Sequence, residues 1–300
     1  MRYLVGVIGA VFLFSAQSAL AALSVLACEP EWASLSRELG GDRVNVSSAT
    51  TAFQDPHRIE ARPSLIARAR SADLLVCTGA ELEVGWKPLL LSQAGNPNIQ
   101  VGRPGNFEAA LYARLIEVPS VVDRSLGDVH PAGNPHLHLN PTNVSRVAAA
   151  LTERMAQIDA ANGGYYRERL KLFQERWQEA VTRWEQQAAP LKGMRIVVYH
   201  RDLSYLIDWL GMREAGTLEP KPGIPPTTGH LTELLAQLSN APASAVVRSA
   251  YNDPRAAEWV SERAKIPAVT VPYTVGGTEK ARDLFSLYDD TIARLLGAAR

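Results

Sequence analysis

Short apolar runs and amphipathic helical runs alternate along most of this 300-residue chain, and this alternation constrains the fold most. Strand-like runs occupy 23–28, 44–48 and 73–79, with helix-like runs at 31–41 and 64–72 between them. The pattern restarts at 194–200 and continues to 299. Alternation of this kind predicts parallel sheets covered by helices. We therefore expect an α/β protein with two doubly wound parallel-sheet lobes.

The segment between the two alternating regions has no strand-like run. An apolar stripe with spacings of three and four predicts one long helix; its members are Tyr166, Leu170, Phe173, Trp177, Val181 and Trp184. We divide the chain into a signal segment (1–21), an N-terminal lobe (22–142), a helical connector (143–190) and a C-terminal lobe (191–300). Ligands of such sheets bind beyond the carboxyl ends of the strands, so we expect a site in the cleft between the lobes.

The N-terminal end of the chain indicates export. Arg2 precedes a short apolar stretch at 4–14, and Ala-Leu-Ala at 19–21 is typical of a signal-peptide cleavage site. The stretch is too short for a confident membrane span. The alternative is a lipoprotein anchored at Cys28. That cysteine lies well beyond the apolar stretch, so a soluble periplasmic protein is the favoured interpretation.

Net charge gives no indication of a nucleic-acid partner. Lysine plus arginine and aspartate plus glutamate number 31 each, and basic blocks are absent from the sequence. The sequence must therefore reveal its function through its loops.

The two cysteines stand at the ends of two predicted strands, Cys28 after the first and Cys77 after the third. In a sheet of order 2-1-3 these strands are neighbours, and their carboxyl ends lie side by side. We predict a disulfide in an oxidising compartment, which would stabilise the fold by about 4 kcal/mol on the chain-entropy estimate. The alternative is a pair of buried free thiols.

Three of the six histidines follow strands or precede a helix where a ligand of the cleft would bind. His57 follows the second strand, His136 precedes the helix that Pro141 begins, and His200 ends the first strand of the second lobe. Imidazole suits zinc, copper or nickel better than manganese or calcium. Each histidine alone is more often a hydrogen-bonded polar residue than a ligand, but together they indicate one metal site.

Three stretches also resemble motifs of the periplasmic metal-binding proteins that serve zinc and manganese ABC transporters. DPHRIEARPSLIARARSADLLVCTGAELEVGW is similar to the first histidine motif, NPHLHLNP to the second, and YHRDLSYLIDWLG to the third. The resemblance covers the mature chain and implies that His57, His136 and His200 are metal ligands. It also implies that the long central helix is a rigid connector of the lobes.

The chain departs from that family at the fourth ligand. Where a late loop often supplies a carboxylate, this chain has VPYTVGG, with Val275 at the corresponding place. Glu219, which follows a strand of the second lobe, is the predicted substitute, and a water molecule is the alternative. His130 and His138 are predicted to help capture metal, as longer histidine-rich loops do in related zinc carriers, although His138 could equally be structural.

The resemblance implies an exported high-affinity receptor that binds Zn²⁺ between its lobes. Its expected partner is a membrane ABC permease with its ATPase, with a periplasmic metallochaperone as a further partner, and we expect a monomer without enzymatic activity. The alternatives are a manganese or iron receptor of the same family, a secreted zinc hydrolase, and a metal-dependent adhesin or metal chaperone. An H-E-x-x-H or G-x-S-x-G motif, which a hydrolase would favour, is absent from the sequence.

Overall fold

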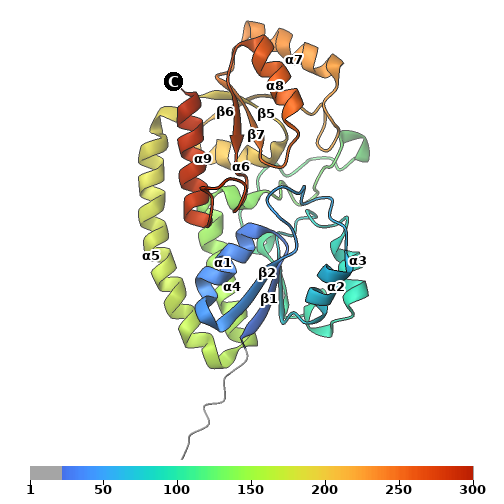
Figure 1. Ribbon diagram of the computed structural model, residues 1–300, viewed down its shortest axis with the longest axis vertical. Coiled ribbons are helices and arrows are strands. Elements are labelled where there is room, and N and C mark those ends of the chain that lie inside the picture. Colours follow the sequence, from blue (N-terminus) through green and yellow to red (C-terminus); the bar gives the residue numbers. More distant parts are fainter. Residues whose placement is uncertain (1–21, 300) are drawn as a thin grey trace, which may run out of the picture.

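The protein consists of two α/β lobes beside a long helix (Figure 1). The computed structural model describes residues 22–299, so the predicted signal segment at 1–21 lies outside the described residues. Each lobe has a four-stranded parallel sheet, of order β2-β1-β3-β4 in the first and β6-β5-β7-β8 in the second. The predicted fold class is confirmed.

In the N-terminal lobe the predicted 2-1-3 strand order is correct, but two elements were not predicted. These are the short edge strand β4, which extends the sheet, and the helix α3, which covers the sheet. Neither was predicted because neither has the long apolar run by which the neighbouring elements are recognised. The strands are β1 (Leu23–Ala27), β2 (Val44–Ser48), β3 (Leu74–Cys77) and β4 (Asn106–Glu108). The helices are α1 (Pro30–Gly40), α2 (Pro63–Arg70) and α3 (Lys87–Ala94).

The C-terminal lobe repeats the strand order of the first lobe. Its strands are β5 (Arg195–Val198), β6 (Arg213–Thr217), β7 (Ala245–Ser249) and β8 (Ala268–Val271). Its helices are α6 (Ser204–Leu210), α7 (Thr228–Asn240), α8 (Pro254–Ala264) and α9 (Leu284–Ala298). The alternation of strands and helices predicted from 194 onward is present.

Two helices occupy the segment between the sheets. Helix α4 (Pro141–Ile158) starts at Pro141 with Asn140 as its N-cap, and α5 (Gly163–Ala188) follows after a short turn. Helix α5 runs along the side of both lobes (Figure 1). Four members of the predicted stripe, Tyr166, Phe173, Trp177 and Trp184, are buried.

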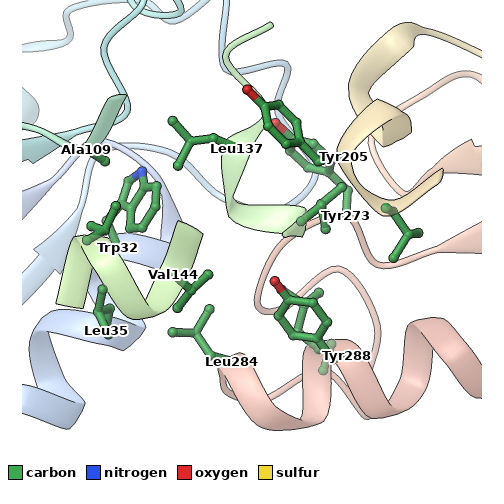
Figure 2. Packing of buried hydrophobic residues seen from close by; sticks show 14 of the residues in the cluster. Trp32, Leu35, Ala109, Leu137, Val144, Tyr205, Tyr273, Leu284 and Tyr288 are labelled. Carbon is green, nitrogen blue, oxygen red and sulfur yellow. The ribbon is translucent and has the colours of Figure 1, made fainter. Parts of the chain in front are cut away.

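The hydrophobic core is continuous between the lobes. A single cluster of buried side chains contains Trp32 of α1, Val144 of α4 and Leu284 of α9, and Figure 2 shows several of its members meeting between the lobes. The Tyr288 hydroxyl donates to the carbonyl of His138 at 2.6 Å, which adds a polar connection across the same region. The two lobes are therefore packed as one body.

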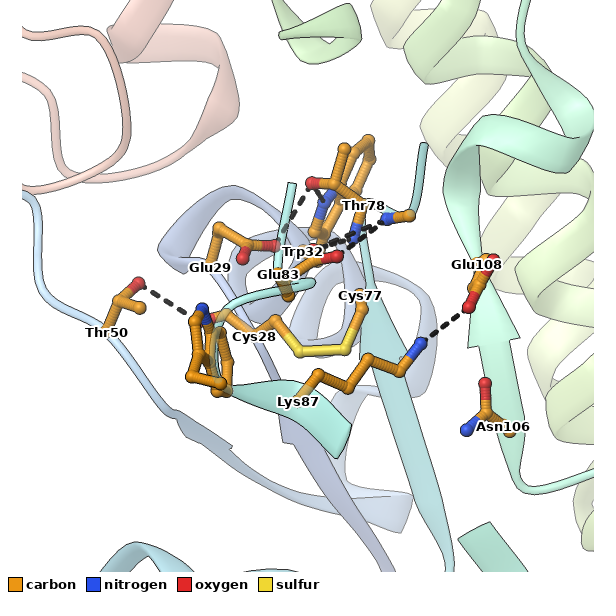
Figure 3. Close-up of a disulfide and its surroundings, with 12 residues drawn as sticks. Cys28, Glu29, Trp32, Thr50, Cys77, Thr78, Glu83, Lys87, Asn106 and Glu108 are labelled. Atoms are coloured by element: carbon orange, nitrogen blue, oxygen red, sulfur yellow. Dashed lines mark hydrogen bonds and ion pairs between the residues drawn. A yellow bond between two sulfur atoms is a disulfide. The ribbon is translucent and has the colours of Figure 1, made fainter. Parts of the chain in front are cut away.

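The predicted disulfide between Cys28 and Cys77 is present at the ends of β1 and β3 (Figure 3). The two Cα atoms are 4.8 Å apart, as expected for neighbouring strands. Beside it, the Glu83 carboxylate accepts hydrogen bonds from the backbone N–H groups of Thr78 and Gly79. This end of the sheet is thus fixed covalently and by buried polar contacts.

Within residues 22–299, the helices are all too short or too polar to cross a membrane.

Candidate metal centre

His57 lies in the loop between β2 and α2, at the carboxyl end of the first sheet. The Trp86 indole N–H anchors this loop by donating a hydrogen bond to the Pro56 carbonyl at 2.8 Å. Asp55 Oδ1 is 2.8 Å from Nδ1 of His57 and also accepts a hydrogen bond from its backbone N–H at 3.0 Å. The carboxylate therefore orients the ring and leaves Nε2 available as an acceptor.

His136 comes directly before the short 3₁₀ turn Leu137–Leu139 that leads into α4. Its backbone N–H donates to Asn134 Oδ1 at 2.9 Å, and its Nδ1 shares a 2.8 Å hydrogen bond with the Tyr273 hydroxyl. Tyr273 belongs to the second lobe, so the ring is positioned from across the cleft. Only 1% of His136 is exposed.

His200 follows β5, the strand in the middle of the second sheet. Its Nδ1 is 2.7 Å from Glu219 Oε2, and the same oxygen accepts a hydrogen bond from the Gly223 N–H at 2.9 Å. Glu219 follows β6, the neighbouring strand, which explains why the two side chains meet. Glu219 thus supports His200 as Asp55 supports His57.

The three rings converge although they come from distant parts of the chain. One potential ligand atom from each of His57, His136 and His200 lies within 4.8 Å of the other two. The ring centroids are 5.3 to 5.7 Å apart. Nε2 of His57 and of His136 is buried without a hydrogen-bond partner. Buried nitrogens of this kind are rare and costly, and a metal ion is the group that would satisfy several at once.

The electrostatic environment differs among these rings. Burial, followed by the nearby His57 and His200 rings, lowers the pKa of His136 well below its ordinary value. Burial also opposes charge on His200, but the Glu219 hydrogen bond and the Asp202 charge outweigh it and raise the pKa of His200. Neutral imidazole is the form that binds metal. His136 is thus held in the binding form, and His200 is the ring for which protons compete most.

Two of the predicted auxiliary residues have different surroundings. His138 is buried, with Nε2 2.9 Å from the Tyr273 carbonyl and Nδ1 3.2 Å from Glu31 Oε1. These contacts occupy both nitrogens, so they favour a structural role and give no support for metal capture. The His130 ring centroid is 5.4 Å from that of His57. Burial and then the charges of His57 and His200 lower the pKa of His130 to about 4.

Glu219 is the predicted fourth ligand, and Val275 stands where the family often has a carboxylate. Glu219 lies outside the group of ligand atoms and contacts Nδ1 of His200 instead. Val275 is half-buried against the core and offers no donor. Sequence reasoning missed Asp55 and Tyr273 as partners of the histidines. Asp55 stands two residues before His57 in the motif already singled out, whereas the contact of Tyr273 depends on the lobes meeting.

Two cavities open onto the histidines. One of about 440 Å³ is lined by His130, His136 and His200, and another of about 200 Å³ by His57, His200 and Glu219. Asp128 lines both of them. The site is therefore reached from the cleft between the lobes.

Comparison with known proteins gives a family match over nearly the whole described chain. The model of the family described as zinc-uptake complex component A, periplasmic, matches residues 25–298. The manganese ABC transporter substrate-binding lipoprotein scaA of Streptococcus gordonii is 23% identical over 278 residues, which cover 91% of this chain and 87% of that protein. The high-affinity zinc uptake system protein ZnuA of Yersinia pestis is 24% identical over 196 residues, 61% of each chain.

Solved structures show the same fold. The crystal structure of ZnuA superposes with a TM-score of 0.77 at 19% identity, covering 93% of this chain and 100% of that one. A manganese-bound periplasmic metal-binding protein from Candidatus Liberibacter asiaticus gives a TM-score of 0.74 at 15% identity, with the same coverage. Sequence identities this low support a shared fold. The preferred metal must be inferred from the residues of this site.

Proposed function

The chain belongs to the family of periplasmic zinc-uptake component A, and from this premise we propose that it captures Zn²⁺ for import. Members of the family are substrate-binding components of metal ABC transporters, so the protein is a solute-binding protein rather than an enzyme. A permease with its ATPase is accordingly its expected partner. The proposal concerns the metal and the residues that hold it.

The convergence of three imidazoles is the observation that carries this proposal. His57, His136 and His200 each have Nδ1 in a hydrogen bond, which directs Nε2 of the ring toward a metal. Imidazole nitrogens favour zinc, whereas manganese favours carboxylate and water oxygen. Two carboxylates that touch the rings, those of Asp55 and Glu219, contact Nδ1 atoms. The donor set therefore favours zinc as the cargo.

Manganese is the second candidate, because several relatives are named for manganese. Elemental analysis of protein purified from the periplasm, followed by competitive titration with both metals, tests the choice. We expect zinc to co-purify and to displace manganese. Preferential binding of manganese would overturn the zinc assignment.

We also propose that the protein is soluble after export. Relatives such as the Streptococcus cristatus protein are named lipoproteins, and this kind of anchor is attached to a cysteine. Both cysteines of this chain are joined in the disulfide. All three candidate ligands come from one chain, which supports a monomer as the working unit. Mass spectrometry of the mature protein should show an N-terminus near residue 22 and no lipid. Delivery of metal by a metallochaperone stays a prediction.

A further inference from the structure

His130 is a fourth imidazole beside the proposed zinc site. The 5.4 Å between its ring centroid and that of His57 falls within the 5.3 to 5.7 Å that separates the other three rings from each other. Its side chain lines the same cavity as His136 and His200. His130 thus lies beside one of the proposed ligands and on the cavity that two others line.

The ring of His130 also has an unsatisfied nitrogen. Its Nε2 is buried and lacks a hydrogen-bond partner, a condition it shares with Nε2 of His57 and of His136. Removing an imidazole nitrogen from water without a partner costs free energy, and proteins rarely leave such atoms unpaired. Three buried, unpaired Nε2 atoms on neighbouring histidines have a common explanation in one bound cation.

The carboxylates that contact the three rings, together with Val275, do not supply a fourth ligand. Asp55 and Glu219 already hold Nδ1 atoms, and Val275 carries no donor. Asp202 has one unpaired carboxylate oxygen, but its other oxygen accepts hydrogen bonds from Ser249 and Tyr251, which hold it in the second lobe. Zinc in proteins takes four ligands in a tetrahedron.

We propose that His130 is the fourth zinc ligand and that the loaded site consists of four imidazoles. This inference rests on the proposed zinc-binding function. His130 is not in the group whose ligand atoms lie within 4.8 Å of one another, so the proposal requires its ring to turn toward His136 and His200 as the ion binds. The cavity of about 440 Å³ beside it provides the room. A set without carboxylates strengthens the preference for zinc over manganese.

X-ray absorption spectroscopy of the zinc-loaded wild-type protein tests the ligand count directly. We expect a first shell of four nitrogens with imidazole scattering, and three nitrogens plus one oxygen in His130→Ala. Three imidazoles and one oxygen in the wild-type protein would overturn the role of His130. Absence of bound zinc in the wild-type protein would instead overturn the proposed function itself.

Competitive zinc titration provides a second test. We expect His130→Ala and the more conservative His130→Asn to bind zinc at least tenfold more weakly, with a smaller change for manganese. His230→Ala is the matched control, because His230 lies at the start of α7 and contacts the Thr217 carbonyl. Equal zinc affinity in His130→Asn and wild type would overturn the proposal.

Discussion

The two lobes have the same strand order, but different groups stand at the carboxyl ends of their inner strands. In the N-terminal lobe the ends of β1 and β3 are joined by Cys28–Cys77. In the C-terminal lobe the corresponding strands, β5 and β7, lead into His200 and Ser249, and Asp202 connects this end through its hydrogen bond with Ser249. The ends of the inner strands thus carry a disulfide in one lobe and a proposed metal ligand in the other. The comparison shows that the proposed site is mounted on one covalently fixed side and one side held by polar contacts.

Removing the covalent connection should have the largest effect. The double substitution Cys28→Ala and Cys77→Ala should lower the free energy of unfolding by about 4 kcal/mol, because the disulfide closes a long loop in the unfolded chain. Urea unfolding measures this loss. Reductant should destabilise the wild-type protein and leave the double variant unchanged. Equal stability of both oxidised proteins would contradict the scaffold role of this end of the sheet.

Removing a proposed ligand from either lobe should weaken zinc binding to the same extent. His57→Ala and His200→Ala should each weaken zinc binding by more than about 100-fold, beyond the 10- to 100-fold typical of residues that only support ligands. Calorimetry with a competing chelator measures both affinities, with His230→Ala as the unaffected control. A large loss in one variant alone would show that a single lobe holds the ion.

The polar support in the second lobe can be weakened without touching a ring. Glu219→Ala should reduce zinc affinity by about 10- to 100-fold, because His200 loses the acceptor that orients it. Glu219→Gln retains an acceptor oxygen and should lose less. The same titration separates the two variants. If Glu219→Ala removed binding as completely as His200→Ala, Glu219 would be a ligand after all.

Of these changes, a lower pH should have the smallest effect on zinc affinity near pH 7. The effect should grow as the pH falls further. The pKa of His200 is raised, so protons compete with metal from above pH 6.5, and affinity should fall by about tenfold per pH unit below that pKa. The pKa of His136 is lowered, so that ring stays neutral. Glu219→Gln should move the onset to lower pH, because the Glu219 charge raises the pKa of His200. An affinity unchanged between about pH 7.5 and 5.5 would exclude a histidine site.

The sequence predicted the sheets from local order along the chain, and it predicted the three histidines from their loops at strand ends together with the family motifs. Apolar strands identify themselves, and parallel topology brings the loops after their ends to one edge. Contacts between the lobes were beyond such reasoning. Tyr273 reaches His136, and His138 lies between Glu31 and Tyr273, only because three segments more than a hundred residues apart meet. For Glu219 the loop after β6 was predicted correctly, but its hydrogen bond with His200 was not predicted.

The continuous core between the lobes has a consequence for how cargo leaves. Because the two lobes share one hydrophobic core, a wide opening of the cleft would separate buried aromatic side chains that pack along α5. If a transporter takes the ion from this site, displacing the short loops that bear the rings would disturb less of this packing than separating the lobes. Loaded and empty receptor would then differ at the rim of the cleft, and the permease would distinguish them by loop order rather than by molecular shape.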